Sequence, residues 1–161
     1  MIDANCIFSV DANKTITRVA GKIKANGDSE SPDGTPYLKA TIADIYDFAF
    51  LQSGEIMIAA IEGVRMISKG KYVHVNSIIT KSVAVSPNDE VYFGAPNLFK
   101  VCKLSFNTPT ICNAIAGTGT NANPSDPPCN GVSSVACALL EVFGIRAFND
   151  RVLFKSKFTL S

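Results

Sequence analysis

The sequence predicts an all-β fold in which four-stranded antiparallel sheets stack face to face, as the blades of a β-propeller do. Short apolar runs bounded by turn residues recur along the chain, a spacing typical of strands. The same order of runs and turns returns later, which indicates a repeated structural unit. Long polar loops at 21–36 and 118–134 follow equivalent points in two of these units. A four-stranded unit cannot bury both of its faces alone, so neighbouring units are expected to stack.

A predicted hairpin comes first. Residues 5–11 and 15–20 are expected to pair across a turn that contains Asn13. Asn13 also matches the acceptor pattern for N-glycosylation, and a plain hairpin turn is the competing interpretation. The second strand ends in the tripeptide Val-Ala-Gly at 19–21, and the loop 21–36, rich in glycine and proline, follows it.

The next four strands are predicted to form a complete sheet. They lie at 45–51, 55–60, 61–67 and 71–75. The strand at 45–51 has little polar face, and we therefore expect it to be buried on both sides.

A second complete sheet repeats this order. Its strands are predicted at 82–86, 90–94, 98–104 and 110–115, and two further strands follow at 142–148 and 151–155. The tripeptide Ile-Ala-Gly at 115–117 repeats the end of the first hairpin. Aligning the alanine of each first strand makes Ala49, Ala84 and Ala147 equivalent positions.

These units are read as one domain over 1–161. It comprises the outer strands of one blade (1–20), a blade at 45–75, a blade at 80–117 and the inner strands of a further blade (142–161). Joined end to end they make about three blades, whereas propellers have roughly four to eight. The chain is therefore expected to be part of a six-bladed wheel, either as a segment of a longer protein or as a homodimer whose two copies complete it. The remaining alternative is that the strands are miscounted and that the chain forms an open stack of sheets or another all-β fold.

The repeated order resembles the NHL repeat, especially its long-loop variety in teneurin-like proteins. The residues that carry the resemblance are 16–21, 33–36, 54–59, 64–67, 87–93 and 115–119. The usual Asp-x-x-Asn after the second strand is replaced at 60–63 and at 95–97, so the repeats are divergent. The motif encodes blade structure and no chemistry; the resemblance implies interaction more than catalysis.

Composition narrows the classes of partner. A hydrophobic content of 47% with 18% charged residues predicts a globular chain, and a net charge of +1 favours neither nucleic acid nor an anionic membrane as partner. Hydrophobic runs are short and broken by charge, so no membrane insertion is expected. The start, Met1-Ile2-Asp3, lacks the basic and apolar segments of a signal peptide.

Five cysteines suggest two local disulfides. Cys102 and Cys112 flank a predicted strand–turn–strand at facing positions, and Cys129 and Cys137 bracket one polar loop. Cys6 is then left over, with a partner outside this chain. Paired cysteines would place the protein in the extracellular space or the secretory lumen. The alternative is five reduced thiols that act as small hydrophobic residues.

The sequence assigns no catalytic, cofactor or metal site. The single histidine, His74, stands between valines on an outer strand, and a solvent-facing or capping role is expected for it. Arg65 and Arg146 lie in apolar stretches, and Arg146 is expected to pair with a carboxylate or to face the central channel.

The expected function is a binding or scaffold module. The loops 21–36 and 118–134 would present a surface to a protein or carbohydrate partner. The alternative is part of a six-bladed hydrolase or lactonase with an axial divalent cation such as calcium. Its candidate ligands are Asp44, Asp47, Glu141 and Asn149.

Overall fold

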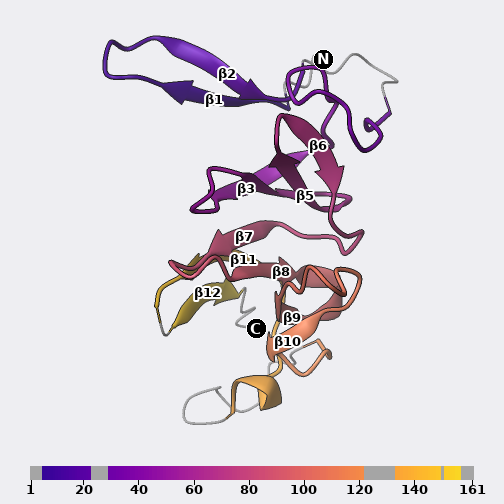
Figure 1. Cartoon of the computed structure of the whole chain (residues 1–161). Coiled ribbons are helices and arrows are strands. Elements are labelled where there is room, and N and C mark those ends of the chain that lie inside the picture. Colours follow the sequence, from indigo (N-terminus) through magenta and orange to yellow (C-terminus); the bar gives the residue numbers. More distant parts are fainter. Residues whose placement is uncertain (1–4, 23–28, 122–132, 150, 157–161) are drawn as a thin grey trace.

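The computed structural model describes residues 5–22, 29–121, 133–149 and 151–156. Within these ranges the chain is all-β, and its strands form four antiparallel sheets that stack along the chain (Figure 1). Two of the sheets have four strands and two have two. This confirms the predicted fold class, with four-stranded sheets arranged like propeller blades.

The hairpin β1–β2 lies at one end of the stack (Figure 1). Strand β1 (Ile7–Val10) pairs with β2 (Ile16–Ala20), and Val10 faces Ile16 across the turn. The carboxylate of Asp11 accepts hydrogen bonds from the backbone N–H groups of Asn13 and Thr15, at 2.9 and 2.8 Å. Asn13 therefore lies in a hairpin turn that a local side chain closes.

Two complete sheets form the middle of the stack. The first has the order β3-β4-β5-β6, with strands Ile45–Phe50, Ile56–Ala60, Gly63–Ser68 and Lys71–His74. The second contains β7 (Ser82–Val85), β8 (Val91–Ala95), β9 (Lys100–Lys103) and β10 (Asn113–Ala116), with a 3-10 turn at Pro96–Leu98 before β9. In both sheets each strand pairs with the next one in the sequence, so the four strands form a meander.

The hairpin β11–β12 closes the other end of the described stack. Strand β11 (Val142–Ala147) pairs with β12 (Val152–Ser156), and β11 packs against β7 and β8. A 3-10 turn at Ser134–Ala136 precedes it.

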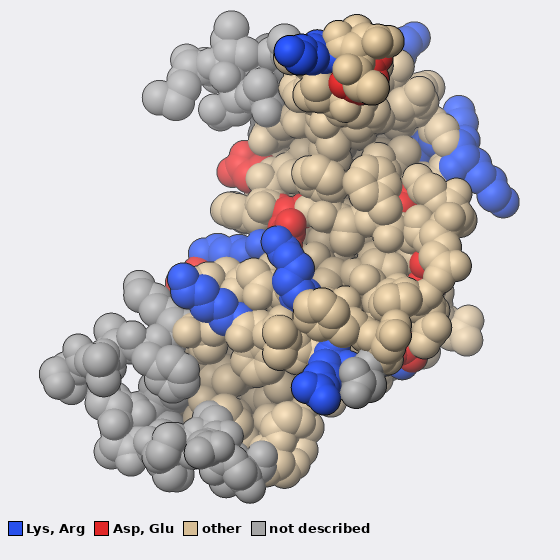
Figure 2. All heavy atoms as spheres, turned by 90° about the vertical axis from the view of Figure 1, so that its left-hand side faces the viewer, with Lys and Arg blue, Asp and Glu red and all other residues tan. Residues whose placement is uncertain are grey.

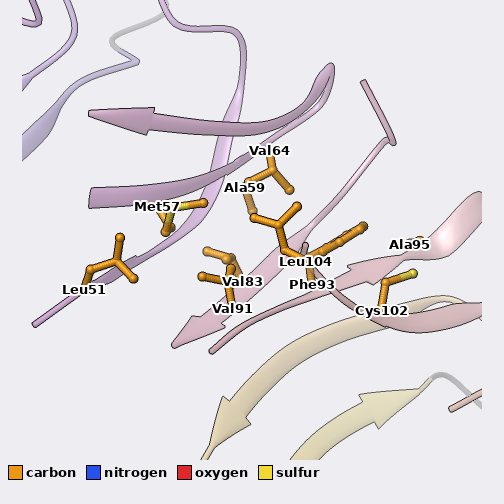
Figure 3. Close-up of a cluster of buried hydrophobic side chains, with 10 residues drawn as sticks. All are labelled: Leu51, Met57, Ala59, Val64, Val83, Val91, Phe93, Ala95, Cys102 and Leu104. Atoms are coloured by element: carbon orange, nitrogen blue, oxygen red, sulfur yellow. The ribbon is translucent and has the colours of Figure 1, made fainter. Parts of the chain in front are cut away.

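The interface between the two complete sheets is the largest core (Figure 3). Met57, Ala59 and Val64 from the β3–β6 sheet meet side chains of β7, β8 and β9, among them the fully buried Phe93. Every residue of β4 and of β8 is buried, because each of these strands has a sheet on both faces.

Strand β3 differs from the expectation that it is buried on both sides. Tyr46, Phe48 and Phe50 are 46%, 42% and 57% exposed. Ile7 and Ala20 of the hairpin β1–β2 pack against buried side chains of β4, β5 and β6. The hairpin therefore covers these strands more than it covers β3. Among the described residues, the inner part of this face is left uncovered.

The expected equivalence of three alanines is also wrong in part. Ala49 packs in the core toward the β7–β10 sheet, and Ala84 packs toward β11, so both face the next sheet along the chain. Ala147 instead faces back toward the preceding sheet. Arg146, which pairs with Leu153 as Ala49 pairs with Met57, holds the equivalent position. The β11–β12 connection is one residue shorter than the β3–β4 connection, and this moves the alanine to the other face.

The repeated glycines Gly21 and Gly117 have a common structural cause. Their φ angles are +82° and +93°, a region that side chains disfavour. A Cβ atom at Gly21 would lie 2.2 Å from the carbonyl oxygen of Asn5, and one at Gly117 would lie 2.1 Å from that of Phe99. Only glycine allows the end of each hairpin's second strand to approach the backbone just before its first strand so closely.

We therefore predict that Gly117→Ala destabilises the protein far more than Gly34→Ala. Gly34 has a φ of +82° but open space around its Cβ position, so its substitution carries only the backbone strain of about 1 kcal/mol. At Gly117 the backbone clash adds to that strain, and we expect a loss of about 3 kcal/mol or more. Urea unfolding of both variants measures the difference, and equal losses would contradict the assignment.

Candidate functional site

A buried arginine ties the first long loop to the β3–β6 sheet. The side chain of Arg65, on β5, is only 3% exposed. Its Nε and Nη2 atoms donate to the two carboxylate oxygens of Glu30, each at 2.7 Å. Its Nη1 atom donates to the carbonyl oxygen of Asn76 at 2.7 Å. The bidentate pair is the geometry in which an arginine can be buried with its charge neutralised.

Tyr72 and His74, on β6, extend this network. The Tyr72 hydroxyl donates to Glu30. The Nδ1 atom of His74 lies 2.6 Å from the Oδ1 atom of Asp33, and its Nε2 atom lies 3.3 Å from Glu30. Asp33 also accepts the backbone N–H of His74 at 2.5 Å. His74 thus joins two carboxylates of one loop to the outer strand, and it is 35% exposed.

The network keeps Glu30 ionised. Burial by itself would raise the pKa of Glu30, but hydrogen bonds from Arg65 and Tyr72, together with the arginine charge, lower it to about 2. Burial and the neighbouring carboxylate raise the pKa of Tyr72, which therefore stays a hydrogen-bond donor. In the part of the chain that the structure describes, no three His, Cys, Asp or Glu side chains are arranged to hold a metal ion.

An apolar groove of about 730 Å³ lies between the hairpin β1–β2 and the inner end of the β3–β6 sheet. Its apolar lining includes Phe8, Val19, Tyr37, Phe48, Phe50 and Ile56. Polar groups come from Ser9, from the turn at 53–55 and from Lys69. We call this surface the hairpin groove. Figure 2, which views the left-hand side of Figure 1, shows a mostly uncharged surface with charged side chains of both signs scattered over it.

A free strand edge borders the hairpin groove. Within the described residues, β1 pairs only with β2, and residues 7–9 of β1 contribute to the lining. Its second edge therefore presents backbone N–H and C=O groups without a neighbouring strand. Apolar pockets beside an open edge are the combination that binds an added strand.

The four axial candidates do not converge on a cation. Asp44 accepts a hydrogen bond from the side chain of Asn5 at 3.3 Å, and Glu141 forms an ion pair with Lys81. Asn149 is exposed beyond the end of β11. Asp44 and Glu141 are engaged by separate neighbours, and the described carboxylates do not gather into a group that could hold a metal ion.

Asp47 is the axial candidate that the structure brings near another predicted residue. Its Oδ2 atom lies 3.8 Å from the Nη1 atom of Arg146, and it accepts the backbone N–H of Val83 at 3.4 Å. Burial raises the pKa of Asp47, although these interactions oppose the shift. Arg146 thus pairs with a carboxylate, as expected, but the contact is long. The arginine side chain is 70% exposed.

The expected disulfide between Cys102 and Cys112 is present, with its Cα atoms 5.1 Å apart. The expected facing positions are wrong, because Cys102 faces Ala114 in the β9–β10 register and Cys112 directly precedes β10. Cys129 lies outside the described residues, so its pairing with Cys137 stays a prediction. Cys6 is a half-buried free cysteine. Much of each predicted binding loop, at 23–28 and 122–132, also lies outside the described residues, while residues 30 and 33 of the first loop are held by the Arg65 network.

Comparison with known proteins identifies no relative. No protein-family model matches the chain, and no curated protein is significantly similar to it. No helix in the described ranges is long and apolar enough to cross a membrane. The fold and the hairpin groove therefore define the chain only as an all-β protein of stacked, blade-like sheets.

Sequence reasoning missed the hairpin groove. Its signal was present in the alternation of Tyr46, Phe48 and Phe50 with smaller or charged residues, which is typical of a strand with one distinct face. That the face is uncovered depends on where the hairpin β1–β2 sits, and a local pattern does not contain this information.

The Arg65 network makes the free energy of unfolding fall as the pH becomes acidic. Because the pKa of Glu30 is lower in the folded chain than its ordinary value of 4.5, its contribution is complete above about pH 4.5 and is lost as pH falls toward 2. We predict that Glu30→Gln flattens this part of the pH profile. At pH 7 the variant should also lose about 3 kcal/mol, because the buried Arg65 loses its bidentate carboxylate and, of its carboxylate contacts, keeps only the longer one with Glu62, at 3.8 Å.

Urea unfolding between pH 2.5 and pH 7 tests this prediction. Asp44→Asn serves as the control, since it removes a carboxylate outside the network. A profile for Glu30→Gln as steep as that of the unmodified chain would show that the network does not govern acid stability.

Proposed function

We propose that this chain is a protein-binding module, similar in architecture to NHL-repeat propellers, that accepts a β-hairpin of a protein partner in the hairpin groove. The observation that carries the proposal is the exposure of Phe8, Phe48 and Phe50, at 53%, 42% and 57%, around one hollow beside an open strand edge. Large aromatic side chains gathered in this way lose contact with water only when a partner covers them.

The partner chemistry follows from the two parts of the groove. The edge of β1 supplies main-chain hydrogen bonds, which any extended backbone can satisfy. The apolar lining selects for bulky side chains at alternate positions of the added strand. A hairpin presents both features, and a second strand lets it reach the aromatic face of β3 as well as the edge of β1.

A protein partner fits this surface better than a carbohydrate does. A sugar needs several side-chain hydrogen-bond partners to replace its water, and the charged groups lining the groove are Glu55 and Lys69. Glu55 already accepts hydrogen bonds from Ser53 and Ser68. No observation favours the hydrolase alternative, since the axial candidates are engaged with separate neighbours.

The test is a displayed library of β-hairpin peptides selected on the full chain. Hairpins enriched on the unmodified protein should bind at least tenfold more weakly to a Phe48→Asp, Phe50→Asp double variant, because charged side chains cannot be covered by apolar ones. Phe106→Asp is the matched control, since Phe106 is 52% exposed and does not line the groove. Failure of a monomeric chain to enrich any hairpin, or binding that the double variant leaves unchanged, would overturn the proposal.

A further inference from the structure

We propose that the hairpin bound in the groove is β11–β12 of a second copy of this chain, and that two copies close head to tail into one ring. This inference rests on the proposed function, because it names the partner of the hairpin groove. It is carried by the two half-sheets at the ends of the described stack.

The hairpin β1–β2 has the form of the outer half of a complete sheet. It repeats β9–β10, because the two hairpins have a register shift at the same place. In β1–β2 the shift lies between the pairs Ile7–Ala20 and Phe8–Arg18, and in β9–β10 it lies between Val101–Ala116 and Cys102–Ala114. Both hairpins end in a glycine of positive φ that lies against the backbone just before the first strand, Gly21 and Gly117. By this equivalence β1 corresponds to the third strand of a sheet and has its free edge toward a missing second strand.

The hairpin β11–β12 has the form of the inner half. It packs on β7 and β8 as β7 packs on β3 and β4, and β11 has a register shift near its start, as β3 does. Within the described residues β12 pairs only with β11, so it corresponds to a second strand whose partner, a third strand, is missing. The two halves therefore complement each other without duplication.

The complete β7–β10 sheet predicts how the halves would pair. There β8 pairs with β9 so that Tyr92 faces Lys103 and Phe93 faces Cys102. Transferring this register to β12 and β1 places Leu153 opposite Ser9 and Phe154 opposite Phe8. In this register each side chain of β12 stays on the face of the sheet that it already occupies. Phe154 packs toward the preceding sheet, and Leu153 lies on the opposite, exposed face.

Burial at equivalent positions supports this pairing from the side of β11–β12. Phe148 and Leu153 are 52% and 58% exposed. The equivalent residues of the complete sheet, Leu51 and Met57, are 8% and 0% exposed because the β7–β10 sheet covers them. A sheet face in the same orientation would cover Phe148 and Leu153 in the same way.

The hairpin groove supplies that face. Phe48, Phe50 and Ile56 occupy the positions that Val83, Val85 and Val91 hold in the next sheet, where they pack against the preceding one. Val83 and Val91 are each 1% exposed, whereas Phe48 and Phe50 are not covered. Each end of the molecule thus has an apolar surface whose counterpart is the opposite end.

The number of sheets in the described residues fits a ring of two copies. One chain that closed on itself would make three complete sheets, fewer than propellers contain. Two copies would contribute four complete sheets and form two composite ones, which gives six. The ring leaves no free edge at β1 or β12, and this removes the risk of open-ended association.

The first test is the solution mass of the full chain with a site-directed cross-link. Light scattering should give twice 17.1 kDa. In a Cys6→Ser background, Ser9→Cys combined with Leu153→Cys should form disulfides between two chains, because these positions would face each other as a non-hydrogen-bonded pair. Ser9→Cys with Phe154→Cys is the control, since those side chains point to opposite faces and should not cross-link.

The second test removes a backbone hydrogen bond between β1 of one copy and β12 of the other. Leu104, equivalent to Val10, donates its backbone N–H to the carbonyl oxygen of Val91 at 2.8 Å. Val10→Pro removes the corresponding donor on the open edge of β1 and should shift the protein to the monomer, whereas Val10→Thr keeps the donor and should remain dimeric. Circular dichroism of both variants checks that the fold is retained.

The outcomes separate this inference from the proposed function. A dimer that forms the Ser9–Leu153 cross-link and dissociates with Val10→Pro supports the ring. A monomer that still selects hairpins through Phe48 and Phe50 overturns the second copy but keeps the protein-binding groove for another partner. A monomer that selects none overturns both, and head-to-tail polymers larger than two copies overturn the closed ring.

Discussion

The structure depends on the face-to-face packing of apolar sheets. Each four-stranded sheet is apolar on both faces, so it is stable only between two neighbours, and the core between the β3–β6 and β7–β10 sheets shows the covered state (Figure 3). Phe93 lies fully buried there, while the aromatic residues of β3 lie exposed on the opposite face of the β3–β6 sheet. The chemistry of the strands is similar at both places, and the presence of a neighbour decides which residues water reaches.

Arg65 shows how a fully buried charge is accommodated in the stack. Arg65 on β5 holds the position that Cys102 holds on β9, since each faces the equivalent residue of the preceding strand. In one sheet a disulfide to Cys112 joins this position to the chain beyond β9, and in the other a loop carboxylate is brought to a buried guanidinium. The disulfide is a local link within the β9–β10 hairpin, with a sequence separation of 10, whereas the Arg65–Glu30 pair joins residues 35 apart and also fixes part of the long loop.

The proposed binding function draws on a different part of the molecule from the buried charges. Glu30 and Tyr72, whose pKa values are strongly displaced, interact with each other and with Arg65, and neither lines the hairpin groove. Tyr92, whose pKa is also raised, lies outside the groove and donates to Glu90. The groove has an open strand edge and aromatic side chains, which are the features that bind extended backbone. Rigid sheets hold both in place, so a partner need not order them on binding.

Local patterns in the sequence determined the positions of the strands, the turns and the Cys102–Cys112 disulfide, because alternation, turn residues and hairpin symmetry act over a few residues. They also indicated that Arg65 was unusual, but they could not name Glu30, which is 35 residues away. Only the tertiary structure decided which face of β3 is exposed, and that Ala147 faces the preceding sheet while Arg146 faces away. Burial depends on what packs against a residue, and a neighbouring sheet is contributed by residues far away in the chain.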